Sequence, residues 1–190
     1  MRVFRMEDSG SLLENNHHMT KMVLVDEKDT IVGYKEKFAT HKIPVALHRA
    51  ISIVIFSKDK IEMLITKRAK IKPTWPYFWT NAVCSHPYPG ETYQKAAERR
   101  LYEELGFRTK LKEVFHLIYS AEMDNKIWGE HELDHVFTGN YEGKIKPNPN
   151  EVAGYEWIKI SDLKEDIKTN PGRYSPWFMI ILNKLEKSVK

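Results

Sequence analysis

The sequence contains a single cysteine, Cys84, among its 190 residues. One cysteine cannot form a disulfide within the chain, which fits a reducing compartment, so we expect a cytoplasmic protein. No run approaches the roughly eighteen apolar residues that a membrane-spanning helix needs, so we expect no membrane partner. The N-terminus carries Arg2 and Arg5 but has no apolar run beyond Leu12 and Leu13, which argues against a secretory signal.

The chain also lacks a strong charge of either sign. Its 30 Lys and Arg against 26 Asp and Glu give a net charge of +4. A basic run with interleaved aromatic residues, typical of nucleic-acid binding, is missing, and we expect no nucleic-acid partner. An apolar content of 42% and a charged content of 29% are ordinary for a globular domain. A few basic residues near the motifs below could serve a small anionic substrate.

Residues 1–20 have no clear period, and we interpret them as a mobile leader or cloning remnant. We expect residues 21–190 to form a single domain. Alternating or continuous apolar runs predict strands at 22–25, 50–56, 62–68, 80–84, 114–121, 130–138 and 154–158. Helices are predicted at about 92–105 and from 175 onward, where Trp177, Ile181 and Leu185 form one apolar stripe. Strands and helices alternate irregularly, which predicts a mixed sheet covered by helices.

The predicted helix at 92–105 begins with a capping signal at Thr92 and ends before Gly106. Arg99 and Glu103 are spaced i,i+4, as are Arg100 and Glu104, so each pair can form an ion pair on the helix surface. That spacing alone favours a salt-bridged surface helix. The alternative is a metal–diphosphate site, because Mg²⁺ binds one or two carboxylates together with phosphate oxygens.

At this point the sequence resembles the Nudix box. The resemblance runs from Ser85 through Glu91 to Arg99-Arg100-Leu101 and Glu103-Glu104-Leu105-Gly106-Phe107. Two positions depart from the pattern: Ser85 replaces the first glycine, and Arg100 replaces the glutamate after the arginine. The second change removes a carboxylate that Nudix hydrolases use for metal binding and adds a cation that could pair with phosphate. The resemblance implies a Nudix-type α/β/α sandwich with a mixed β-sheet, but it weakens a hydrolase assignment.

Five residues of metal-ligand type lie outside this helix: His41, His48, His86, Glu130 and Glu132. A lone histidine is more often a packed or surface residue than a ligand. Glu130 and Glu132 are two apart on a predicted strand and therefore share one face, where they repel unless a cation or a proton is present. Imidazole and carboxylate together suit Mn²⁺, Zn²⁺ or Fe²⁺. Spacing alone leaves open whether the five converge.

Three sequence segments, TNAVCSHP (80–87), WGEHELD (128–134) and SPW (175–177), together resemble type 1 isopentenyl diphosphate isomerase, a divergent Nudix-fold family. The resemblance implies isopentenyl diphosphate and dimethylallyl diphosphate as substrate and product. It implies one divalent metal (Mn²⁺, Mg²⁺ or Zn²⁺) on His41, His48, His86, Glu130 and Glu132, and a second, diphosphate-bound Mg²⁺ on Glu104. It implies Cys84, Glu132, Tyr119 and Trp177 as catalytic residues, and Lys37, Arg68, Lys72, Ser85 and Arg100 as substrate-binding residues.

The implied roles match the chemistry of moving a double bond by one carbon. Cys84 and Glu132 would transfer protons on opposite faces of the substrate, with Glu132 as the first donor and Tyr119 hydrogen-bonded to it. The π face of Trp177 would stabilise a tertiary cation by about 2 kcal/mol when desolvated. A cysteine can exchange the second proton if its pKa moves toward neutrality. The loop 73–79 and the C-terminal segment are candidate lids that exclude water.

Cys84 and Trp177 also have ordinary structural explanations, and two other functions are alternatives. Cys84 could be a small buried core residue, and Trp177 could belong to the core as well as to the site. A Nudix hydrolase would release phosphate or a nucleotide and would tolerate loss of Cys84. A metal-dependent binding or regulatory module would keep the fold without turnover. We expect a monomer or a weak homodimer.

Overall fold

The computed structural model describes residues 21–188, so residues 1–20, predicted to be a leader or cloning remnant, lie outside the described residues. The strands are β1 (Lys21–Val25), β2 (Ile31–Glu36), β3 (His48–Phe56), β4 (Glu62–Arg68), β5 (Trp79–Thr80), β6 (Val83–Ser85), β7 (Lys112–Glu122), β8 (Gly129–Asn140) and β9 (Val152–Lys159). The helices are α2 (Lys37–Thr40), α3 (Tyr93–Leu105), α4 (Ile160–Thr169), the 3₁₀ helix η1 (Pro171–Arg173) and α5 (Pro176–Ser188). None of these helices is long and apolar enough to cross a lipid bilayer.

Strand β3 lies at the centre of the sheet. It pairs antiparallel with β1, β4 and β6, and parallel with β8 along its whole length. β8 in turn pairs antiparallel with β7, and β4 pairs antiparallel with β5 and β9. One parallel pair within an otherwise antiparallel sheet makes the sheet mixed, as the sequence predicts.

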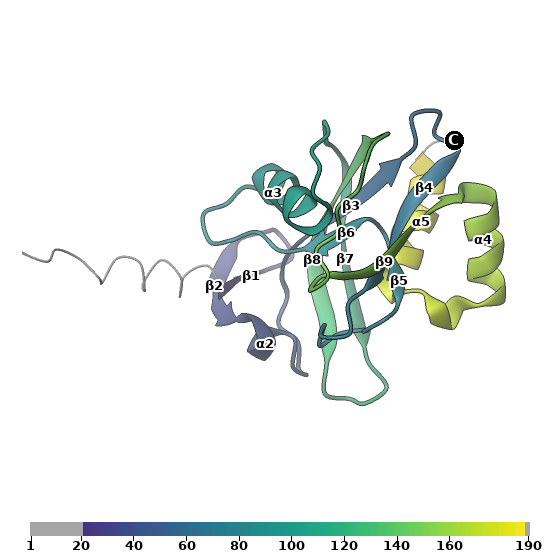
Figure 1. The fold of residues 1–190 in the computed structure, drawn as a ribbon. Helices are drawn as coiled ribbons and strands as arrows, with labels where there is room; N and C mark the ends of the chain where they lie inside the picture. The colour runs from purple at the N-terminus through teal and green to yellow at the C-terminus, as the bar shows by residue number, and fades with distance from the viewer. Residues whose placement is uncertain (1–20, 189–190) are drawn as a thin grey trace, which may run out of the picture.

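Helices cover both faces of this sheet (Figure 1). Successive β3 side chains point to opposite faces, so Ile51 and Ile53 pack in one cluster with Leu101 of α3. Val54 packs in the other cluster with Phe178 of α5, and α4 adds to that same layer. The predicted α/β/α sandwich is therefore confirmed.

The local signals at the ends of α3 act as predicted. The Thr92 side chain accepts a hydrogen bond from the Lys95 amide at 3.2 Å and so satisfies one free N–H of the first turn. Gly106 ends the helix in the left-handed region with φ of 74°, where a Cβ would lie 2.9 Å from Lys146. In α5 the predicted apolar stripe of Trp177, Ile181 and Leu185 is buried.

The predicted continuous strand at 80–84 is wrong, because the chain breaks it into β5 and β6 at Asn81. The Asn81 Nδ2 donates hydrogen bonds to the Ile53 and Val83 carbonyls, at 3.1 and 2.8 Å. The Asn81 side chain thus bonds these backbone carbonyls where the strand pairing is interrupted. The elements β2, α2 and α4 were not predicted. β2 gave no clear signal because much of it, including Ile31 and Val32, is exposed.

Candidate active site

A cavity that opens to solvent, with a volume of about 490 Å³ when its open mouth is included, gathers most of the predicted site residues. Its lining comprises Lys37, His41, Arg68, Lys72, Pro73, Thr74, Cys84, Ser85, His86, Tyr119, Glu130, Glu132 and Trp177. Three predicted site residues, His48, Arg100 and Glu104, are not part of this lining. Histidines and carboxylates occupy one part of the cavity wall, and the basic side chains come from α2 and from the end of β4 and the loop that follows it.

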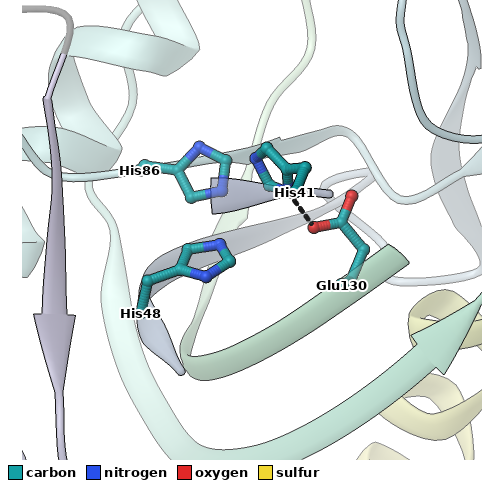
Figure 2. A group of neighbouring side chains, drawn as sticks. All are labelled: His41, His48, His86 and Glu130. Carbon is teal, nitrogen blue, oxygen red and sulfur yellow. Dashed lines mark ion pairs between the residues drawn. The ribbon is translucent and has the colours of Figure 1, made fainter. Parts of the chain in front are cut away.

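Four of the predicted metal ligands converge (Figure 2). His41, His48, His86 and Glu130 each offer a ligand atom, and these atoms lie within 4.8 Å of one another. The four residues come from the end of α2, the start of β3, the residue after β6 and β8. Distant segments of the chain therefore build one cluster.

Backbone contacts bring the α2 and β8 members together. The His41 carbonyl accepts a hydrogen bond from the Gly129 amide at 2.9 Å, which sets Glu130 beside His41. Gly129 is required here because a Cβ would lie 2.7 Å from the Ala121 carbonyl oxygen. The Nδ1 atom of His41 and the Oε2 atom of Glu130 are 2.8 Å apart.

The sheet orients the β3 member. His48 Nδ1 lies 2.8 Å from the Ala46 carbonyl oxygen, which can only accept, so Nδ1 donates to it and Nε2 faces the cluster. The parallel pairing of β3 with β8 places His48 opposite Glu132. The His48 side chain is completely buried, so the orientation of its ring is fixed.

Buried polar atoms in the cluster fit a metal ion. His41 Nδ1 and Glu130 Oε2 face each other at 2.8 Å, and apart from that contact these two atoms and His48 Nε2 have no hydrogen-bond partner among the described residues. Burying such atoms without a partner is costly. Three imidazoles and one carboxylate are the donor set that Mn²⁺, Zn²⁺ or Fe²⁺ prefers, so a divalent cation would satisfy all three atoms.

Glu132 lies at the edge of this cluster. Its Oε1 is 3.0 Å from His86 Nε2 and 3.6 Å from His48 Nε2. The Tyr119 hydroxyl donates a hydrogen bond to Oε2 at 2.5 Å, and the expected contact between these two residues is thus present. Burial alone would raise the pKa of Glu132, but the interaction with His48, the hydrogen bond from Tyr119 and the charge of His41 bring this pKa below its ordinary value.

Cys84 is surrounded by polar side chains. The Trp177 Nε1 donates to its sulfur at 3.0 Å, and the thiol can donate to Asn81 Oδ1, also at 3.0 Å. Because two carbonyls hold the Asn81 amide nitrogen, its oxygen must face Cys84. Burial, and next the charge of Asp134, raise the pKa of Cys84 to about 12. This shift is opposite to the expected move toward neutrality, because the charge of Arg68, which lowers the pKa, does not outweigh burial.

Trp177 belongs to both the core and the cavity wall. It is 2% exposed and meets the Trp75 ring edge to face at 5.3 Å between centroids. The Arg68 guanidinium lies 5.1 Å from the Trp177 ring centroid and donates hydrogen bonds to the carbonyls of Thr74 and Trp75. Arg68 therefore fastens the 73–79 loop against the cavity, and Pro73 and Thr74 of this loop line it.

The remaining basic residues have different surroundings. Lys37 has no ion pair among residues 21–188, and burial, together with Lys72 and Arg100, lowers its pKa. Arg100 donates to Glu104 at 2.7 Å, and Glu104 is buried. A second cavity, of about 600 Å³, is lined by Arg100 together with Lys37, Ser85 and His86. The two cavities therefore share residues at the predicted diphosphate end of the site.

The sequence interpretation missed two acidic residues beside the site, Asp134 and Glu151. Asp134 is fully buried, and neither of its oxygens has a hydrogen-bond partner within residues 21–188. Burial and the Glu132 charge raise its pKa well above the ordinary value. The spacing of Glu130, Glu132 and Asp134, two residues apart along β8, could have identified it. Glu151 follows a turn, and no local pattern marked it as part of the site.

A second group of possible ligands, Glu113, His116 and His135, lies on β7 and β8. His135 Nδ1 is 2.7 Å from Glu113 Oε1, and the His135 ring stacks on Tyr93. The imidazole rings of His116 and His135 are also stacked, with 21° between their planes. Their nitrogen lone pairs lie in the ring planes and therefore run side by side instead of converging on one point. An ordinary histidine–carboxylate hydrogen bond accounts for this group.

Comparison with known proteins agrees with this architecture. The family model of the NUDIX domain matches residues 46–178. The chain is 38% identical to isopentenyl-diphosphate Delta-isomerase 2 of Aromatoleum aromaticum, covering 87% of this chain and 86% of that protein. It is 40% identical to isopentenyl-diphosphate Delta-isomerase of Pectobacterium atrosepticum, covering 85% and 89%.

Solved structures show the same fold at low sequence identity. DR0079 from Deinococcus radiodurans superposes with a TM-score of 0.65 at 19% identity, covering 79% of this chain and 90% of that chain. The MutT protein from Methanosarcina mazei superposes with a TM-score of 0.61 at 16% identity, covering 76% and 96%. These likenesses concern the fold alone. The NUDIX match and the curated relatives together show that the chain belongs to the isopentenyl-diphosphate Delta-isomerase family.

Proposed function

We propose that this chain converts isopentenyl diphosphate to dimethylallyl diphosphate within isoprenoid biosynthesis. The observation that carries the proposal is the composition of the cavity wall, where the Cys84 thiol, the Glu132 carboxylate and the Trp177 indole accompany a cluster of basic side chains. Two proton carriers suit the displacement of a double bond, and the basic residues suit a diphosphate. The names of the curated relatives describe this reaction for those proteins.

His41, His48, His86 and Glu130 would hold one divalent metal, Mn²⁺, Mg²⁺ or Zn²⁺, with Glu132 at its edge. When bound, such a cation supplies positive charge that tunes the acidity of the neighbouring carboxyl group. Glu104 would bind a second ion, Mg²⁺, that arrives with the diphosphate. Mg²⁺ binds through one or two carboxylates plus phosphate oxygens, and a buried glutamate on α3 fits that pattern.

The reaction adds one proton to the terminal C4 methylene and removes one proton from C2, so the substrate gains and loses one proton in total. Cys84 and Glu132 are the proposed carriers, on opposite faces of the substrate. Tyr119 holds Glu132 by a hydrogen bond to Oε2. The order expected from the sequence, with Glu132 as the first donor, stays a prediction.

Protonation at C4 leaves a tertiary cation at C3, which water would capture. The Trp177 indole offers a π surface to this cation, worth about 2 kcal/mol when desolvated. Arg68 fastens the 73–79 loop to the cavity and so helps to exclude water. Lys37, Arg68, Lys72, Ser85 and Arg100 are proposed to bind the diphosphate, which directs the hydrocarbon end toward Cys84 and Glu132.

Incubation with isopentenyl diphosphate and Mg²⁺ separates this proposal from a hydrolase. An allylic diphosphate ionises in acid, so the isomerase should form an acid-labile product while free phosphate stays at the level of the blank. A Nudix hydrolase would release phosphate and would lose little activity on Cys84→Ala. Phosphate release without an acid-labile product would contradict the proposed function.

A further inference from the structure

We propose that Glu151 is a positioning residue of the diphosphate site, which holds Lys72 and Arg100 in place from behind. The inference rests on the proposed function, because it assumes that these two cations meet the diphosphate. Glu151 touches neither the thiol nor the histidine cluster in any described contact. It would act through the two basic side chains that it binds.

The backbone places Glu151 between two elements of the site. The Glu151 carbonyl accepts a hydrogen bond from the Ala69 amide at 3.0 Å, at the base of the loop that carries Lys72. On the other side, the Asn148 amide donates to the Glu104 carbonyl at 2.8 Å, which ties the same turn to the end of α3. The Asn148 carbonyl accepts from the Glu151 amide at 2.9 Å and closes this turn. Glu151 is thus fixed between the Lys72 loop and α3.

The Glu151 side chain then joins both cations. One carboxylate oxygen is 2.7 Å from Arg100 Nη2, and the other forms a short ion pair with Lys72 Nζ. Glu151 is the only ion-pair partner of Lys72 among residues 21–188. Burial alone would raise the pKa of Glu151, but Lys72 and Arg100 lower it to about 2, so the carboxylate is charged at any physiological pH.

The residues that line the two cavities show whether Glu151 positions the cations or competes with the diphosphate for them. A carboxylate that occupied the place of the diphosphate would face the cavity and would weaken anion binding. Lys72 lines the first cavity and Arg100 the second, whereas Glu151 lines neither. The carboxylate therefore contacts the two cations without lining either cavity, so it does not occupy the place of the diphosphate.

Positioning matters here because the cations are crowded and flexible. Lys and Arg side chains lose rotamer entropy when they are fixed, and an ion pair formed on folding removes part of that cost from ligand binding. The charges of Lys72 and Arg100 also lower the pKa of the neighbouring Lys37, whereas Glu151 raises it. Without Glu151, Lys72 would lose its ion pair among residues 21–188, whereas Arg100 would keep its ion pairs with Glu103 and Glu104.

Titration calorimetry with magnesium pyrophosphate tests this role without depending on turnover. We expect Glu151→Ala to raise the dissociation constant about tenfold, the effect of one lost charge-assisted contact. Glu151→Gln should raise it by a smaller factor, because the amide keeps the size of the side chain and can still accept a hydrogen bond from Arg100. The matched control is Glu165→Ala, which removes an exposed glutamate paired with Lys168 on α4 and should leave the constant unchanged.

Two further measurements separate positioning from a purely structural role. In a Lys72→Ala background, Glu151→Ala should change the dissociation constant by less than about threefold. Lys72 is then already gone, and Arg100 is still held by Glu103 and Glu104. Relative to an active wild-type enzyme, the Glu151→Ala variant should show a KM that rises by a larger factor than kcat falls. A lower melting temperature with unchanged pyrophosphate affinity would overturn the inference, and tighter binding would show that Glu151 competes with the ligand. Failure of the wild-type chain to isomerise the substrate would instead count against the proposed function.

Discussion

Replacing Cys84 by alanine should lower turnover of isopentenyl diphosphate by about a thousandfold or more. A positioned proton-transfer group contributes roughly 10²- to 10⁴-fold. The Ser52 and Thr80 hydroxyls and the Trp177 N–H beside this sulfur are much weaker acids than a thiol. The Asn81 amide oxygen that faces Cys84 can only accept. Cys84→Ser should also be strongly impaired, because a serine hydroxyl is a much weaker acid than a thiol. Steady-state kinetics with isopentenyl diphosphate measure both variants.

The control for both variants is to measure whether the fold and the diphosphate site are preserved. Cys84 is one small side chain among Thr80, Ser52 and Trp177, so its truncation should lower the melting temperature by only a few degrees. Magnesium pyrophosphate affinity should stay unchanged, because the basic residues are untouched. A Cys84→Ala protein with near-normal turnover would remove the cysteine from the mechanism.

Glu132→Gln should cause a loss of similar size, about a thousandfold or more in kcat. The glutamine has the shape of glutamate and can keep the Tyr119 contact, but it neither carries an acidic proton nor provides a negative charge beside His86. The expected loss therefore lies mainly in the chemical step. Single-turnover kinetics with saturating substrate isolate that step from binding.

Tyr119→Phe is the matched comparison for Glu132. It removes only the hydroxyl that donates to Glu132, so the carboxylate remains but is less firmly oriented. Residues that orient a group at a metal site typically contribute about 10- to 100-fold, so a smaller loss than that of Glu132→Gln is expected. Equal activity of Glu132→Gln and the wild-type enzyme, at equal metal content, would exclude Glu132 as a proton carrier.

Local signals in the sequence were sufficient for the regular elements. Thr92 and Gly106 mark the ends of α3 because capping depends on neighbouring residues alone. The break at Asn81 was not predictable, because the Asn81 side chain bonds the carbonyl of Ile53, which is 28 positions away in the sequence. Strand β2 was missed because none of its residues is buried, so it has no buried apolar face.

Prediction of the site depended more on family resemblance than on spacing. The shared face of Glu130 and Glu132 follows from their separation by two residues, and both side chains do meet histidines. The proximity of His48 to Glu132 arises from the parallel pairing of β3 and β8, which no local pattern reveals. Glu151 joins the site through a turn and two cations from other elements, so only the three-dimensional structure identified it.

Deuterium incorporation tests the central claim most directly. The exchangeable protons of Cys84 and Glu132 equilibrate with solvent, so the proton delivered to C4 in D₂O is a deuteron. Metal-loaded protein incubated with isopentenyl diphosphate and Mg²⁺ in D₂O should yield dimethylallyl diphosphate with deuterium in the methyl group derived from C4, without phosphate release, as followed by NMR. Unchanged substrate free of deuterium, from protein with full metal content, would contradict the account.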